Sequence, residues 1–71
     1  MEQNYDEAVR WYRNAAEHDS ADAEYGLGRC YCLGHGVKRD SIKGENLFME
    51  AAKHGHKEAQ EYFKSRYYFV D

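Results

Sequence analysis

Five side chains of this 71-residue protein belong to the types that bind zinc, namely Cys30, Cys32, His35, His54 and His56. Their spacing argues against a shared metal site, because residues two apart on a helix point to nearly opposite sides. The same geometry disfavours a disulfide between the two cysteines. Buried apolar thiols are the simpler interpretation, since free cysteine is among the most buried residue types. We therefore predict no metal and no cofactor, with a metal-binding regulator as the alternative from another functional class.

Motifs of catalysis and of nucleic-acid or membrane binding are lacking in the sequence. It has no glycine-rich phosphate loop and no nucleophile elbow. A net charge of −3 without a cluster of lysine or arginine offers nothing to nucleic acid or to an anionic membrane. No apolar run approaches the roughly 18 residues of a spanning helix, and the start MEQNYDEA is acidic where a secretory signal is basic. The expectation is a non-enzymatic, cytoplasmic protein with a protein or peptide partner.

The elements that position these residues follow from an internal repeat. Residues 1–35 align with residues 37–71 at an offset of 36, and the agreement falls on small and aromatic positions. The identical pairs are Ala15/Ala51, Ala16/Ala52, His18/His54, Ala23/Ala59 and Tyr31/Tyr67. A period of this length is typical of stacked helical repeats. Such arrays act mainly by presenting a binding surface.

Apolar periodicity and capping residues predict four helices, at about residues 5–17, 21–33, 41–53 and 57–68. Asn4 with Glu7 forms a capping pair before the first helix, and Ser20 and Asp40 are expected to cap the second and third. The absence of proline and a hydrophobic content of 42% agree with uninterrupted helices in a folded chain. The fold class is all-α.

The predicted core lies on one stripe of each helix. The first stripe contains Trp11 and Tyr12, so that truncating Trp11 is expected to cost about 3–5 kcal/mol if it is buried. Between the second and third helices, Gly34 and Gly36 are expected to adopt positive φ, with Val37 packed beneath the turn. The remaining structural positions are Ala15, Ala16, Ala23, Leu27, Gly28, Tyr31, Ala51, Ala52 and Ala59.

Residues 21–40, ADAEYGLGRCYCLGHGVKRD, resemble the first helix and long turn of the Sel-one-like repeats, which belong to the tetratricopeptide-like solenoids. Every fixed position of the pattern A-x-A-x-Y-x-L-G-x-x-Y-x-x-G-x-G-V is present. Residues 41–60, SIKGENLFMEAAKHGHKEAQ, are similar to the second helix and its link. The resemblance implies a single domain over residues 1–71, an α/α solenoid of four antiparallel helices with one full repeat flanked by two half repeats.

Three positions depart from the family pattern. Gly44 stands where alanine is favoured, at a cost of about 1 kcal/mol in helix propensity. Lys38 replaces a common turn proline. Lys64 takes the place of Gly28, where a missing side chain lets neighbouring helices approach, so the fourth helix is expected to be a terminal cap. The last residues, YYFVD, are apolar and are expected to dock on the fold.

The resemblance also implies a scaffold for protein contacts, in which the first helix of each unit lines a concave surface. The mixed charges around two tyrosines would suit a peptide of mixed or slightly basic character. The narrower alternative is a dedicated partner of one protein, such as an inhibitor or immunity protein. The concave positions that the family register assigns are Asp22, Tyr25, Gly26 and Arg29, then Glu58, Glu61, Tyr62 and Ser65.

A second candidate surface is the outer face of the first helix. It has no preceding partner in the register, yet it carries Trp11, with Tyr5, Val9 and Tyr12 on adjoining faces. Exposed apolar patches of a few hundred Å² usually mark contact sites. Upstream repeats, a second copy in a homodimer, or another protein would cover it. A charge at Val9 is expected to break a dimer without unfolding the chain.

Overall fold

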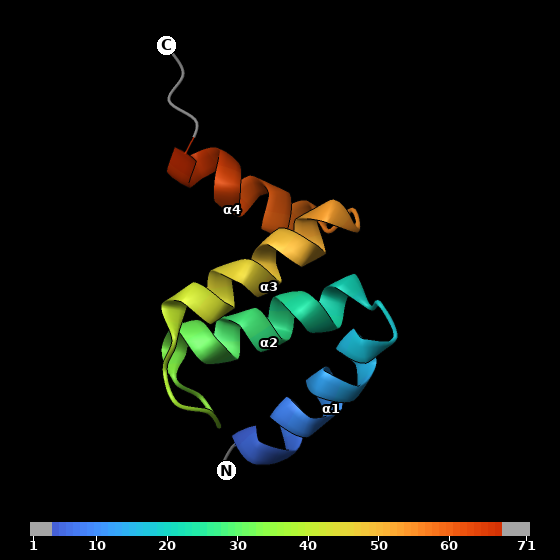
Figure 1. Cartoon of the computed structure of the whole chain (residues 1–71), viewed down its shortest axis with the longest axis vertical. Coiled ribbons are helices and arrows are strands. Elements are labelled where there is room, and N and C mark those ends of the chain that lie inside the picture. The colour runs from blue at the N-terminus through green and yellow to red at the C-terminus, as the bar shows by residue number, and fades with distance from the viewer. Residues whose placement is uncertain (1–3, 68–71) are drawn as a thin grey trace.

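The computed structural model describes residues 4–67, which form four helices and no strand. The helices are α1 (Tyr5–Glu17), α2 (Ala21–Leu33), α3 (Ser41–Lys53) and α4 (Lys57–Tyr67). They follow one another in a zigzag, with α2 and α3 side by side in the middle and α1 and α4 at the two ends (Figure 1). This is the all-α solenoid that the repeat predicts. The fourth helix was predicted to extend to residue 68, and the YYFVD segment was predicted to dock on the fold. Residues 68–71, which include the last four residues of that segment, lie outside the described residues.

Local sequence sets where the helices begin. The side chains of Asn4, Ser20 and Asp40 each accept a hydrogen bond from the backbone N–H three residues further on, at 3.1, 3.3 and 3.1 Å. Each bond satisfies a first-turn donor that has no partner inside the helix. At its other end α2 stops at Gly34, whose φ of 74° is left-handed and whose N–H donates to the carbonyl oxygen of Cys30. All three predicted N-caps are present.

Replacing Gly36 by alanine should lower the free energy of unfolding by more than replacing Gly55. Both glycines have positive φ, 77° and 92°, where an alanine costs about 1 kcal/mol or more. A Cβ at Gly36 would also lie 2.7 Å from the carbonyl oxygen of Tyr5 and 2.9 Å from Val9 Cγ2, whereas one at Gly55 would meet nothing within 4 Å. Urea denaturation of both variants measures the difference. Equal losses would show that the loop does not press on α1.

α2 and α3 approach each other closely where they cross, at two glycines. A Cβ on Gly28 would lie 2.8 Å from the Phe48 ring and 2.9 Å from the carbonyl oxygen of Gly44. A Cβ on Gly44 would lie 2.7 Å from the carbonyl oxygen of Gly28 and against the sulfur of Cys32. Packing therefore explains why position 44 is glycine and not the alanine of the family pattern, because only a residue without a side chain lets the two helices approach this closely.

The buried core runs along the inner faces of α1, α2 and α3 and includes Ala59 of α4. Its central cluster is Val9, Leu27 and Cys30, with Tyr12, Tyr31, Val37 and Leu47 packed against it. Of the predicted structural alanines, the fully or nearly fully buried ones are Ala23, Ala51 and Ala59, and the half-buried ones are Ala15, Ala16 and Ala52. Val9 is only 3% exposed, so its prediction as a surface contact is wrong.

Trp11 is the clearest departure from the expected core. Its side chain is 71% exposed, although the sequence pattern placed it on the inward stripe of the first helix. The reason is visible in its repeat partner Leu47, which packs towards α2, whereas α1 has no described helix on the corresponding side. The large destabilisation expected for truncating Trp11 is therefore withdrawn, because exposed positions usually change stability by only about 0.5 kcal/mol.

Candidate binding groove

An open groove of about 740 Å³ runs along α2. The N-terminal half of α1 forms one wall, and the start of α4 closes one end. α2 lines it at each successive turn with Asp22, Tyr25, Gly26, Arg29, Cys30 and Leu33. The other lining residues are Asn4, Tyr5, Ala8, Tyr12, His35, His56 and Glu58.

Four of the sequence-predicted contact residues, Asp22, Tyr25, Arg29 and Glu58, line this groove together. Gly26 also lines it, but the Tyr12 ring covers the position, since a Cβ there would lie 2.7 Å from that ring. The Gly26 backbone is therefore a packing surface for α1.

The other predicted contact residues lie elsewhere. Glu61 and Ser65 are exposed on α4 and do not line the groove. Tyr62 is half-buried: its hydroxyl donates to a Glu45 carboxylate oxygen at 2.9 Å, and its ring packs edge-on against Phe48 at 4.7 Å. Tyr62 thus joins α4 to α3. Trp11 lies outside the groove, in a shallow depression on α1.

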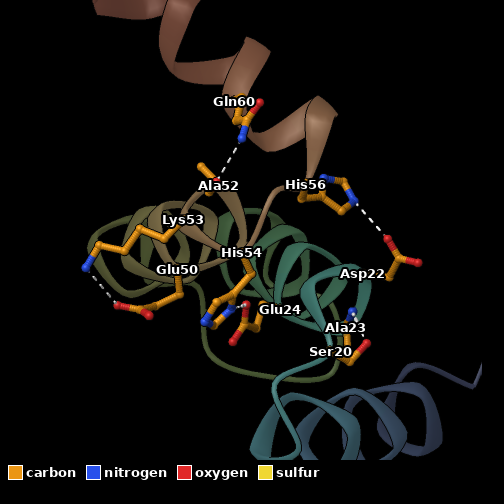
Figure 2. A network of polar contacts seen from close by, with 10 residues as sticks. All are labelled: Ser20, Asp22, Ala23, Glu24, Glu50, Ala52, Lys53, His54, His56 and Gln60. Carbon is orange, nitrogen blue, oxygen red and sulfur yellow. Dashed lines mark hydrogen bonds and ion pairs between the residues drawn. The ribbon is translucent and has the colours of Figure 1, made fainter.

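The Tyr25 ring packs against two neighbouring aromatic rings in the groove. Its ring stacks on His56 with centroids 4.5 Å apart and packs on Phe48 at 5.1 Å. His56 Nδ1 accepts the Ala59 backbone N–H at 3.1 Å, which leaves the proton on Nε2. That Nε2 then donates to an Asp22 carboxylate oxygen at 3.2 Å (Figure 2). One imidazole therefore caps α4, orients a carboxylate and supports an aromatic ring.

The sequence analysis considered His56 only as a zinc ligand and did not predict its role as a helix cap and stacking partner. The repeat could have predicted the capping role, because His56 occupies the position equivalent to Ser20, the N-cap of α2. At the opposite end of the groove His35 stacks on Tyr5, with ring centroids 4.2 Å apart. Both histidines therefore build the groove wall from loops.

Another polar contact, with a buried carboxylate, ties the start of α2 to the end of α3. The Glu24 side chain is 8% exposed, and His54 Nδ1 donates to its carboxylate at 2.9 Å (Figure 2). This hydrogen bond raises the pKa of His54 above its ordinary value of 6.5. Glu24 was not among the predicted site residues, since its partner lies 30 positions away.

Stability should decrease as the pH rises through the raised pKa of His54. The stabilisation is complete below the unfolded value of about 6.5 and is lost as His54 deprotonates in the folded state, because only the cation prefers the folded protein. Melting temperatures between about pH 5.5 and 8.5 measure this. Glu24→Gln removes the carboxylate and should flatten the dependence in that window. An unchanged slope in Glu24→Gln would contradict the assignment.

The five residues that were considered as zinc ligands, with a spacing that argued against a shared site, do not lie in one cluster. Neither Cys30 nor Cys32 forms a disulfide, and burial raises the pKa of Cys30. His35, His54 and His56 have the separate contacts given above. Within the described part of the chain, one group of three potential ligand atoms lies within 4.8 Å of one another. Its atoms belong to Asp19, Glu24 and His54. The Glu24–His54 hydrogen bond already accounts for the buried carboxylate there.

Comparison with known proteins identifies a repeat family. The model of the Sel1 repeat family matches residues 1–20 and residues 21–56. The second match spans α2, the long loop, α3 and the turn after it, and the first covers α1 and its turn. No solved structure matches the chain. Among residues 4–67, none of the helices has the length and apolar character needed to cross a membrane.

Proposed function

Because the chain belongs to the Sel1 repeat family, we propose that it is a non-catalytic module that binds a protein partner through the groove along α2 and the adjoining face of α1. Repeats of this family are generally protein–protein interaction modules. In support, the groove is lined by Asp22, Tyr25, Arg29 and Glu58, which are four of the eight concave positions that the family register assigns.

The packing of Tyr25 between two aromatic rings is the observation that supports this proposal most strongly. A tyrosine fixed between His56 and Phe48 loses little side-chain freedom when a partner binds. Tyrosine is also enriched among residues that contribute most to binding energy. Around it the groove carries one cation, Arg29, and the carboxylates of Asp22 and Glu58. This arrangement fits a protein segment of mixed or slightly basic charge.

A charge swap tests the groove without changing net charge. In Arg29→Glu/Glu58→Lys, both altered residues line the groove, so capture of specific proteins from a lysate of the source cells should fall about tenfold or more. The matched control is Glu50→Lys/Lys53→Glu, which reverses an exposed ion pair of 3.7 Å on α3. Quantitative mass spectrometry compares the captured proteins.

The control should bind as the parent does. Equal capture by the groove variant, the control and the parent would contradict the proposed function. A single partner recovered in equimolar amount would identify a dedicated binding protein of the inhibitor or immunity kind, and several partners would identify a scaffold.

A further inference from the structure

Four cationic side chains that lie apart in the sequence meet in one pocket between α1, α2 and the start of α3, which we call the basic pocket. Its volume is about 520 Å³, and its charged lining residues are Arg13, Lys38, Arg39, Lys43 and Asp40. Four cations and one carboxylate give this lining a net charge of +3, whereas the whole chain carries −3. The sequence shows only Lys38 and Arg39 as neighbours, so the fold creates the cluster.

The basic pocket lies on the side of α2 away from the binding groove. Arg29 lines the groove, and Tyr31 lines the basic pocket. Because an α-helix turns once in about 3.6 residues, side chains two positions apart point to nearly opposite sides. Among the described residues, none lines both openings. The basic pocket is therefore a separate surface, and a ligand there does not depend on the function proposed for the groove.

Tyr31 brings two of the cations together. Arg13 Nη2 donates a hydrogen bond to the Tyr31 hydroxyl oxygen at 3.0 Å. The Lys43 ammonium lies over the Tyr31 ring, 5.3 Å from its centroid. The hydroxyl proton of Tyr31 has no acceptor among residues 4–67, so it can be donated to a ligand. A guanidinium, an ammonium and an O–H donor thus converge beside one ring.

This arrangement of charge does not stabilise the fold. Lys43 lies in the first turn of α3, and Lys38 and Arg39 directly precede its N-cap, Asp40. Positive charge is unfavourable there, because the N-terminus of a helix is itself the positive end of the helix dipole. Within the described chain, none of the four cations forms an ion pair with a carboxylate. A bound anion would offset their mutual repulsion.

An apolar depression adjoins the basic pocket. The two share Arg13, Tyr31 and Lys43, and the apolar part of the depression is formed by Leu27 and Leu47. Its volume of about 400 Å³ leaves room for an apolar side chain of a ligand. The chemistry of the combined surface is therefore cationic on one side and apolar on the other.

We propose that the basic pocket and the adjoining depression bind an acidic segment of a partner protein, in which an apolar residue lies among the carboxylates. Charge complementarity selects the carboxylates. Arginine and lysine give them charge-assisted hydrogen bonds, which are stronger than neutral ones. Leu27 and Leu47 receive the apolar side chain. The carboxylate of Glu50, which also lines the depression, is paired with Lys53 at 3.7 Å.

Nucleic acid fits this surface less well. Single strands bind largely by stacking bases on aromatic rings, but Lys43 already lies over the Tyr31 ring. Leu27 and Leu47 offer nothing to a phosphate backbone, and the carboxylate of Asp40 repels it. A single phosphate group would use the cations and leave the apolar depression empty. The occupant that uses both parts is a protein segment.

Fluorescence anisotropy of a labelled peptide at low ionic strength is the direct test, since salt screens exposed charges. The probe is fluorescein-labelled Glu-Glu-Leu-Glu-Glu, for which we expect saturable binding. Arg13→Gln/Lys43→Gln should weaken it by about tenfold or more. The matched control is Arg10→Gln/Lys57→Gln, which removes the same charge from exposed positions outside the basic pocket and the depression. It should bind as the parent does.

A second variant guards against a folding defect. Lys38 is exposed in the loop and makes no hydrogen bond or ion pair within residues 4–67, so Lys38→Gln should keep the parental circular dichroism and weaken binding about threefold. The groove variant Arg29→Glu/Glu58→Lys should bind the peptide as the parent does. Failure of the groove and failure of the basic pocket are therefore distinguishable.

Two further peptides test the chemistry of the ligand. Glu-Glu-Ser-Glu-Glu should bind about fivefold or more weakly than the leucine peptide, because it loses the apolar contact. Gln-Gln-Leu-Gln-Gln should not bind. Equal binding by either peptide, or by Arg13→Gln/Lys43→Gln and its control, would overturn the inference, as would no binding up to millimolar concentration.

Other occupants would also overturn it. Tighter binding of labelled hexathymidylate, lost in Arg13→Gln/Lys43→Gln, would assign the basic pocket to nucleic acid. A mass that rises towards twice 8.4 kDa with concentration, and does not rise in Arg13→Gln/Lys43→Gln, would assign it to a second copy of the chain. Light scattering measures the mass.

Discussion

Phe48→Ala should unfold much or all of the protein at 25 °C. The Phe48 side chain is 4% exposed and contacts Gly28 and Tyr25 of α2 and Tyr62 of α4, so it joins three helices. Truncating a buried phenylalanine costs about 3–5 kcal/mol. A domain of this size has a total stability of roughly 4–11 kcal/mol. Circular dichroism melts and urea titrations measure the loss.

The matched control is the neighbouring Met49→Ala, since Met49 is 47% exposed on the same helix. It should melt close to the parent temperature. A Phe48→Ala variant that melts as cooperatively and as high as Met49→Ala would show that α2, α3 and α4 do not share one core.

Val9→Glu should be nearly as disruptive. Val9 is buried against Leu27 and Cys30, and a glutamate there has no cation to pair with in the described core. Burial shifts a carboxyl pKa by about 3 units or more, which corresponds to about 4 kcal/mol at neutral pH. The expected result is loss of helical circular dichroism at pH 7, with partial recovery near pH 4. This corrects the expectation that a charge at Val9 would act on association alone.

Trp11→Glu is the companion variant, because it places the same charge two residues away on the exposed side of α1. Its stability should stay within about 0.5 kcal/mol of the parent. A reversal of the two effects would mean that α1 is rotated about its axis relative to the structure described.

The helix order and the caps could be predicted because each depends on short-range sequence. Asn4, Ser20 and Asp40 bond to the N–H three residues away, and Gly34 takes the left-handed φ that a helix end favours. The internal repeat then predicted the same pair of helices in both halves of the chain. The family register, which assigns positions along each helix, predicted four of the residues that line the groove.

The two sides of α1 could not be told apart from sequence. Val9 and Trp11 are both apolar, and which one is buried depends on which side has a neighbouring helix. The contacts of Glu24 with His54 and of Tyr25 with His56 join residues about 30 apart, so helical spacing carried no sign of them. The need for glycine at position 44 likewise could not be predicted from sequence, because it depends on the α2 backbone that packs against this position.

Acrylamide quenching of Trp11 fluorescence, in the free protein and in complex with the partner recovered by capture, tests the central claim most directly. The account predicts efficient, concentration-independent quenching in the free chain, because the side chain is 71% exposed, and strong protection in the complex. Weak quenching in the dilute free chain would mean that the α1 face is already covered. Unchanged quenching on complex formation would mean that the partner binds elsewhere, and either result would contradict the account.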